Sequence, residues 1–303
     1  MKPCKKALKS GSLSSLNQPR IRRNSLESPF LRAPYDVREK ILRLVVGDHL
    51  IHLSSHDPYP GGPCKLDKRH IRHSICVCPF TEDDAYQKFS NGGEEDFAYA
   101  GHHMGCLLNE SQTTTAQCRI DLQILGASRQ SYEEALNLFW NTNMFSFPID
   151  DYRTFSAFVS RLNAQQRGKI AKVQISASSY EDLEQDELSR HVSPEALRQL
   201  KGLRTLHIHF LQRPRLFEWI NSDPERPDPC RLLYLPPFAA FQGINWKHVT
   251  VVVGDDIEAK HSIPPSRWSS HKKRQFAKDL RQRLLNPTEG GVFCTEAIAC
   301  EDE

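Results

Sequence analysis

The sequence predicts an α/β (or α+β) fold: a single domain of alternating helix-strand units with a partly parallel sheet, a disordered N-terminal leader and a long loop insertion. Three observations predict it. Helical periodicity is followed by a stop residue and an alternating strand, and this order recurs along the chain. Hydrophobic residues make up 39% of the 303 residues, enough for a sizeable core. Turn-rich sequence is concentrated between residues 54 and 120.

Residues 1–28 are rich in Ser and Lys, lack periodicity and are expected to form a disordered basic leader. The leader ends in "RRNSLESP", where Ser25 follows two arginines and Ser28 precedes a proline. Both serines are phosphorylation candidates, and a phosphate would add roughly −1.5 to −2 charges to a positive segment. The alternative is a plain solvated tail.

The α/β domain is expected over residues 29–255, starting with a helix at "DVREKILRLVV". Asp36 would cap this helix, with Glu39 reaching back to close a capping box. Four apolar residues fall on one helical face and are expected to enter the core: Val37, Ile41, Leu44 and Val45. Gly47 would end the helix, and a short strand follows at "DHLIHL".

The loop-rich insertion at 54–120 holds the only concentration of soft metal ligands. The weak candidates for zinc are Cys64, His70, His73, Cys76, Cys78 and Cys106. The pair "CVC" is closer than the C-x₂₋₄-C spacing of structural zinc sites, so no metal and no other cofactor is predicted. A mobile or partner-ordered loop with free thiols is the preferred interpretation.

The next unit is "LGASRQSYEEALNLFWNTNMFSF", residues 125–147. Ser128 or Ser131 would cap its helix, and Asn143 would end it in the left-handed conformation that Asn tolerates. Tyr132 and Trp140 are expected in the core, and Phe145 and Phe147 on one side of the following strand. Arg129 would tie loop carbonyls or bind a carboxylate, and Glu134 would form a local pair.

The same pattern continues to residue 253. A helix is expected at 151–162, strands at 169–177, 204–210 and 248–253, and a helix capped by Ser193 that begins at Pro194 and stops by Gly202. The histidines of "LHIHF" would point outward from their strand.

Residues 256–303 are expected to form a basic helix and an acidic tail. The helix at 271–285 carries the candidate contacts to nucleic acid, namely Lys272, Lys273, Arg274, Lys278, Arg281 and Arg283. The alternative is a solvated helix neutralised by the acidic tail. No aromatic stacking pattern accompanies the charge, so nucleic acid is the secondary hypothesis.

Composition excludes several classes of protein. The longest apolar runs are strand-sized, so no membrane segment is expected. The basic leader has no apolar block, and nine scattered cysteines form no disulfide framework, so an intracellular protein, cytoplasmic or nuclear, is expected. Neither a phosphate loop, nor a G-x-S-x-G elbow, nor an H-E-x-x-H helix occurs, and no enzyme is predicted.

Three segments carry a resemblance to a known family, which covers roughly residues 28–255: the two motifs described next and, later in the chain, "IAKVQI…LKGLRTLHIHF". "APYDVREKIL" and the Arg-x-x-Tyr-x-Glu-Ala pattern from Arg129 to Ala135, which continues to Phe147, resemble motifs of an uncharacterised fungal family, a domain of unknown function with an F-box-like N-terminal motif. The residues that match the F-box-like motif include Pro34, Asp36, Val37, Arg38, Ile41 and Leu42. The resemblance implies that these residues bind a partner, a Skp-type adaptor of a ubiquitin ligase, while the sheet beyond holds a target.

The sequence therefore favours a non-enzymatic protein-interaction module, with a nucleic-acid-associated protein as the alternative and an enzyme with a dispersed site third. One conflict stands in the favoured hypothesis. The apolar stripe on the helix at 33–46 is needed both for the core and for an adaptor, and one stripe cannot serve both fully.

Overall fold

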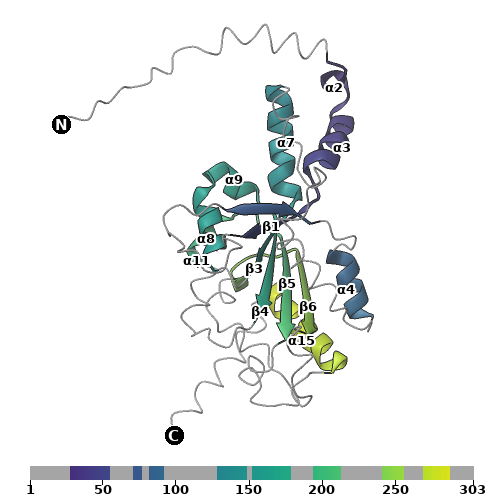
Figure 1. The fold of residues 1–303 in the computed structure, drawn as a ribbon, viewed down its shortest axis with the longest axis vertical. Helices are drawn as coiled ribbons and strands as arrows, with labels where there is room; N and C mark the ends of the chain where they lie inside the picture. The colour runs from purple at the N-terminus through teal and green to yellow at the C-terminus, as the bar shows by residue number, and fades with distance from the viewer. Residues whose placement is uncertain are drawn as a thin grey trace, which may run out of the picture. The chain divides into compact units, whose positions relative to one another are not determined.

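The structure, a computed structural model, describes residues 28–54, 71–76, 82–91, 128–148, 152–178, 194–212, 241–255 and 269–286 (Figure 1). The predicted leader up to residue 27, most of the insertion, Ser193 and the acidic tail lie outside these residues. The chain divides into two compact units, residues 1–47 with 120–139 and residues 48–119 with 140–303. The domain boundaries expected from the sequence stay predictions.

The first, helical unit contains α2 (Pro29–Arg32), α3 (Tyr35–Val46) and the greater part of α7 (Arg129–Thr142). Its core is formed by Leu42, Val46, Ala135 and Leu138, with Phe30 and Val45 packed against them. This core joins two segments about 90 residues apart in sequence, so α3 depends on α7 for the burial of its apolar side.

The second unit is built on a six-stranded sheet of order β2-β1-β3-β4-β5-β6. Its strands are β1 (Leu50–Ser54), β2 (Arg72–Ile75), β3 (Met144–Pro148), β4 (Lys172–Ser178), β5 (Thr205–Gln212) and β6 (His248–Asp255). Strand β2 is antiparallel to β1, and the other neighbours are parallel. The predicted α/β class with a partly parallel sheet is confirmed.

The described residues of this unit form five helices: α4 (Glu82–Ser90), α8 (Tyr152–Arg161), α9 (Ala164–Lys169), α11 (Pro194–Gln199) and α15 (Ser270–Leu285). Among them, α11 begins at Pro194 as predicted. Elements β2 and α4 form regular structure in the segment that was expected to be a loop. The sequence did not reveal β2 because this strand is short and polar and gives little periodic signal. No described helix is long and apolar enough to cross a membrane.

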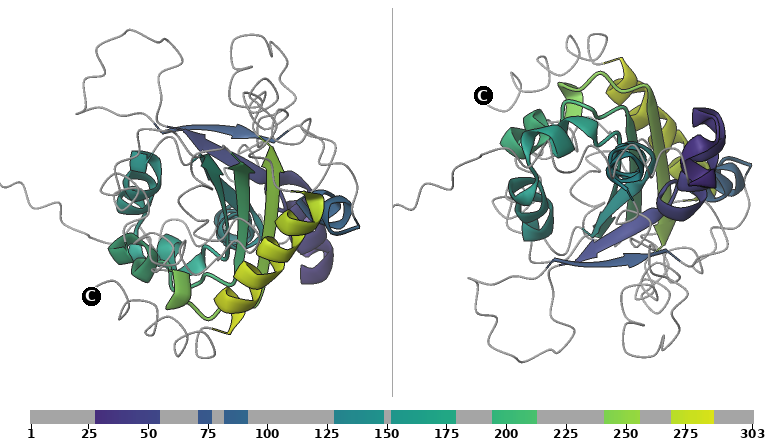
Figure 2. Two further views of the ribbon diagram at one scale, coloured as in Figure 1. Left: turned by 90° about the horizontal axis from the view of Figure 1, so that it is seen from below. Right: turned by 90° about the horizontal axis from the view of Figure 1, so that it is seen from above.

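The parallel strands follow one another in sequence order across the sheet, β1, β3, β4, β5 and β6. Helix α11 contacts α8 and α9, and these three helices lie on one side of the strands (Figure 2). Because their order never reverses, the parallel strands in the described part of the chain form no switch point, the place where open α/β sheets usually bind nucleotides.

The sheet side facing α8 is apolar. Phe155 and Phe158 of α8 contact Phe147, with ring centroids 5.0 and 5.5 Å apart, and Trp140 stacks on Phe145 at 5.6 Å. The row across the strands on this side consists of Ile51, Phe145, Val173, Leu206 and Val249, all buried. The predicted core positions Phe145, Phe147 and Trp140 are therefore confirmed.

The histidines of β5 were expected to point outward to an exposed surface, which is wrong. His207 and His209 are only 3% and 6% exposed. They do point away from the apolar side, but that side of the sheet is covered too. Period-two alternation reveals which residues share a side of a strand and not whether that side meets water.

The turns from helix to strand depend on side chains that the sequence only partly reveals. Asn143 ends α7 as predicted, although by another mechanism: the left-handed residue among the described non-glycine residues is Asp48, with φ of 55°. Buried Asn143 accepts a hydrogen bond at Oδ1 from the His49 N–H, at 2.7 Å. Thr142 Oγ1 accepts from the Asp48 N–H at 3.1 Å. These bonds tie the start of β1 to the start of β3.

Gly202 lies in the turn after α11, which ends at Gln199. A Cβ atom at this position would lie 2.4 Å from the Gly168 carbonyl oxygen and 2.8 Å from that of Ile170. Glycine is therefore required here because the turn after α11 closely approaches the backbone at the C-terminal end of α9, in addition to the helix stop that the sequence predicts.

Candidate protein-interaction surface

Helix α3 begins after Pro34, which serves as its N-cap without a side-chain hydrogen bond. The predicted Asp36 cap with a Glu39 capping box is wrong, because the helix starts earlier and places Asp36 in its first turn. There the carboxylate still favours the positive helix end. Glu39 instead pairs with Arg43 one turn later, at 2.9 Å.

The buried side of α3 also differs from the prediction. The structure buries Arg38, Leu42 and Val46, with Val45 partly covered. Val37 and Ile41 are each 40% exposed and Leu44 is 83% exposed, whereas these three residues were expected in the core. The apolar residues of α3 lie on two different sides of the helix. The side that packs against α7 and is buried is the one that carries Arg38.

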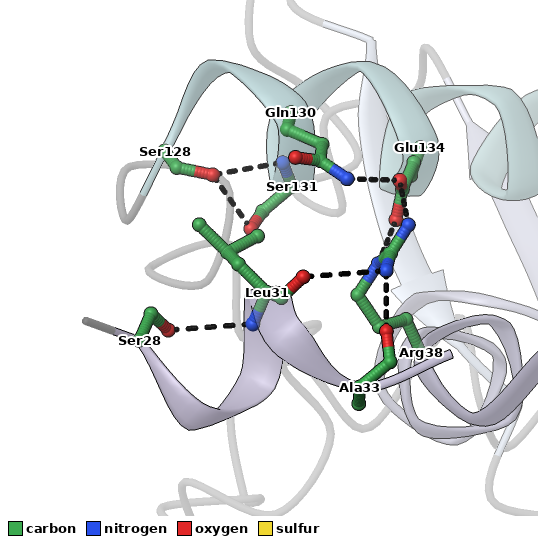
Figure 3. A network of polar contacts seen from close by, with 8 residues as sticks. All are labelled: Ser28, Leu31, Ala33, Arg38, Ser128, Gln130, Ser131 and Glu134. Carbon is green, nitrogen blue, oxygen red and sulfur yellow. Dashed lines mark hydrogen bonds and ion pairs between the residues drawn. The ribbon is translucent and has the colours of Figure 1, made fainter. Parts of the chain in front are cut away.

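Arg38 can be buried in the contact between α3 and α7 because its charge is paired with a carboxylate there (Figure 3). Its Nε and Nη2 atoms donate to the two carboxylate oxygens of Glu134 at 3.0 and 2.7 Å. Its Nη1 donates to the carbonyl oxygens of Ala33 at 2.5 Å and Leu31 at 3.4 Å. Gln130 donates to the same carboxylate at 2.9 Å. A bidentate pair of this kind has both strength and fixed geometry.

The pair changes the titration of both groups. The hydrogen bond from Arg38 holds the pKa of Glu134 below its ordinary value, against the opposing effect of burial. The hydrogen bond to Glu134 in turn raises the pKa of Arg38. Both groups are therefore charged at neutral pH, and Arg38 fastens α3, the end of α2 and α7 together.

The roles expected for the charges of α7 are thus exchanged. Arg129 was expected to tie loop carbonyls, but it is exposed and pairs with Glu133 at 2.8 Å. Arg38 ties the carbonyls instead, and Glu134 pairs with this distant arginine and not only locally. The predicted cap is confirmed for Ser128, whose Oγ accepts from the Ser131 N–H at 3.0 Å.

Tyr132 is 45% exposed, so its predicted core position is wrong. On α7 the core-facing positions are taken by Ser131, Ala135 and Leu138. Small residues at the first two of these positions allow the two helices to approach closely, which leaves the large Tyr132 ring outside.

The three exposed apolar residues of α3, Val37, Ile41 and Leu44, are spaced four and three residues apart and therefore lie on one side of the helix. We call them the α3 stripe. Tyr35, 56% exposed, adds an aromatic ring at the start of the same helix, 5.8 Å from the Arg38 guanidinium. Grouped exposed apolar residues of this kind are typical of interaction sites.

The structure divides the six residues predicted to bind a partner. Pro34, Asp36, Val37 and Ile41 are exposed and available for binding. Arg38 and Leu42 are buried in the contact with α7 and stabilise the fold. Leu44 belongs with the exposed group, and its spacing from Val37 and Ile41 was the sequence signal for it.

The basic helix α15 is amphipathic as predicted, with Phe276, Leu280 and Leu284 buried. Lys273 is buried as well, at 3% exposure. Arg281 donates from Nε to the Val249 carbonyl oxygen at 2.9 Å and lies over the Tyr86 ring of α4 at 6.0 Å. Of the six nucleic-acid candidates, Lys278 is exposed, and Lys272, Arg274, Arg281 and Arg283 are half-buried. The nucleic-acid hypothesis stays a prediction.

The remaining candidates fall mainly outside the described residues. His73 is exposed on β2 and Cys76 is half-buried at its end, whereas Cys64, His70, Cys78 and Cys106 are not described. The described residues contain no cluster of potential metal ligands. Ser28 acts as the cap of α2, its Oγ accepting from the Leu31 N–H at 3.4 Å, and Ser25 is not described.

The fold and this surface define an α/β protein with a helical unit that exposes an apolar stripe. A family model described as a domain of unknown function, DUF7730, matches residues 23–227, and the chain belongs to this family. The matched region runs from α2 to β5 and ends before β6 and α15. No curated protein and no solved structure matches the chain. The F-box-like character and the fungal origin are not part of this match.

Proposed function

We propose that the chain is a non-enzymatic protein-interaction module that works inside the cell and binds a Skp-type adaptor of a ubiquitin ligase through the α3 stripe. The observation that carries the proposal is the exposure of Val37, Ile41 and Leu44 on a helix that forms a core with its other side. Because α3 has two apolar sides, one side can pack into the core while the other binds a partner, so the two roles no longer compete for one stripe.

The helix is also well prepared for binding. The Arg38–Glu134 pair and the contacts to the Ala33 and Leu31 carbonyls fix the start of α3, so little conformational entropy is lost when a partner binds. An apolar helix side with residues at i, i+4 and i+7 fits the helix-in-groove mode of recognition. The charged residues Asp36 and Lys40 beside the stripe would form a polar rim.

Affinity purification of the tagged chain from its own cells, after nuclease treatment, tests the proposal. We expect mass spectrometry to recover a Skp-type adaptor and a cullin with the wild type, and neither with Ile41→Asp. Asn141→Asp adds the same charge at an exposed position of α7 and should recover both. An unchanged partner list with folded Ile41→Asp protein would contradict the proposal. Chromatin or RNA proteins without an adaptor would favour the nucleic-acid alternative.

A further inference from the structure

The exposed large apolar side chains of the described residues all lie in the helical unit. Four of them belong to α3, namely the α3 stripe and Tyr35, and the fifth is Tyr132 of α7. The described part of the larger sheet unit exposes none. The chain therefore presents its apolar surface to water in one place, and a surface of this kind favours association.

Tyr132 lies on the same side of the helix pair as the α3 stripe. Helices α3 and α7 lie side by side (Figure 1). They run parallel, because Arg38 pairs with Glu134 in the first half of each helix and their shared core follows toward both helix ends. At about 100° per residue, the stripe lies roughly 120° to one side of the buried residues of α3.

On α7, Tyr132 and the half-buried Leu136 lie roughly 120° to the opposite side of the buried residues. In a parallel pair whose buried sides meet, these opposite rotations bring both groups to one face. We call it the helix-pair face, and it consists of Val37, Ile41, Leu44, Tyr132 and Leu136.

The size of the helix-pair face limits how tightly it binds. Helix α3 has 12 residues. Two neighbouring helices of about 18 Å length and about 10 Å width present a face of roughly 360 Å². Stable complexes bury about 800 Å² on each partner. The face therefore suits a weak and reversible association.

The charges beside the stripe are complementary to those of a second copy of the chain. Asp36 and Lys40 are exposed on the edge of α3 that points away from α7. They are one turn apart and of opposite sign, yet they form no ion pair with each other in the described part of the chain, whereas Glu39 and Arg43 do, at 2.9 Å. An acid and a base beside one apolar stripe match the same pattern in reverse direction.

An antiparallel pairing about a two-fold axis uses both features. In the register that sets Val37 of one copy against Ile41 of the other, Asp36 lies beside the second copy's Lys40. The two-fold axis repeats this contact, so two ion pairs flank the apolar one. The same axis places α7 against the second copy's α7, which covers Tyr132.

We infer that two copies of this chain pair antiparallel through the helix-pair face and form a weak dimer with two reciprocal Asp36–Lys40 contacts. The dimer covers the α3 stripe while no other partner is bound, and it competes with the adaptor for that stripe. The competition rests on the proposed function, whereas the dimer itself does not.

Sedimentation equilibrium of the purified full chain, over a concentration series and without an adaptor, tests the inference. We expect a reversible equilibrium between monomer and dimer for the wild type. Asp36→Lys places a lysine beside the second copy's Lys40 in both contacts and should weaken the dimer by about tenfold or more. Lys40→Glu should weaken it similarly, because it sets two carboxylates together. Both positions are exposed, so the variants should fold.

Two combinations of these changes are specific to the antiparallel arrangement. The double variant D36K/K40E exchanges the two charges and should restore the dimer to about the wild-type affinity. A mixture of the two single variants should form heterodimers more tightly than either variant pairs with itself. Glu195→Lys makes the same charge change at an exposed position of α11 and is the matched control, which should dimerise like the wild type.

The inference is overturned if the wild type stays monomeric up to its solubility limit. It is also overturned if its dimer is insensitive to both single variants, or if the double variant dimerises no better than the single ones. An adaptor that binds a chain which never dimerises would contradict this inference alone. A dimer that shows the expected charge dependence without any adaptor binding would contradict the proposed function alone.

Discussion

Helices α3 and α15 are both short, charged and amphipathic in sequence, yet the structure uses them in opposite ways. Helix α15 buries its apolar residues Phe276, Leu280 and Leu284 and also buries Lys273. Helix α3 leaves Val37, Ile41 and Leu44 exposed and instead buries Arg38. The neighbouring element therefore decides which side of an amphipathic helix is buried, and in α3 it leaves an apolar side exposed, as is typical of interaction sites.

The largest effect is expected from the apolar side of α15. Phe276→Ala should lower the free energy of unfolding by about 3–5 kcal/mol, because it removes a buried aromatic ring and leaves a cavity. Urea denaturation followed by circular dichroism measures it. Gln282→Ala on the exposed side of the same helix is the control. If both changes had equally small effects, the apolar side of α15 would not be buried in the core, and α15 would not differ from α3 in this respect.

The next effect concerns the charge that α3 buries. Arg38→Ala should cost about 3 kcal/mol, because Glu134 is left in the helix contact without its partner. A double-mutant cycle with Glu134→Ala should show strong coupling, since each change removes the same pair. Independent, additive effects in denaturation experiments would mean that the pair does not hold α3 to α7. Arg129→Ala, which removes an exposed pair, should change little.

The same pair gives a pH dependence of known sign. Because folding lowers the pKa of Glu134 below its ordinary value of 4.5, the stabilisation is complete above that pH. It is lost as the pH falls through the folded-state pKa. Thermal unfolding from pH 6 downward should therefore show a steeper loss for the wild type than for Glu134→Gln. Parallel curves for the two proteins would contradict the assignment.

The smallest effect on stability is expected at the C-terminal end of the α3 stripe. Leu44→Ser should change the free energy of unfolding by no more than about 0.5 kcal/mol, because its side chain is 83% exposed. Denaturation should thus separate it clearly from Leu42→Ser in the core. A large destabilisation by Leu44→Ser would show that the stripe is covered within the chain and is no binding surface.

Much of the sheet unit could be predicted from the sequence because its signals are local. The alternation at Phe145 and Phe147, Pro194 at a helix start and the apolar run of β6 each determine structure within a few residues. The helical unit could not be predicted in the same way. Whether Ile41 or Leu42 enters the core depends on α7, and the burial of Arg38 depends on Glu134, 96 residues away.

The candidate sites show the same limit. The α3 stripe was visible as an apolar pattern, but its exposure was not, because the sequence offers two apolar sides of one helix. The buried polar side of the sheet was visible only in part, as alternating polar residues in β5. The alignment of its residues across the strands depends on the strand registers, which pair Gln174 with both Ser146 and His207 and which no local pattern encodes.

Calorimetric titration of a purified Skp-type adaptor into the full chain tests whether the α3 stripe binds the adaptor. We expect saturable binding by the wild type and by Asn141→Asp, and a loss of at least about tenfold in affinity for Leu44→Asp, which would place a charge in the desolvated contact. No binding by the wild type, or equal binding by folded Leu44→Asp protein, would contradict the assignment of the α3 stripe as the adaptor-binding surface.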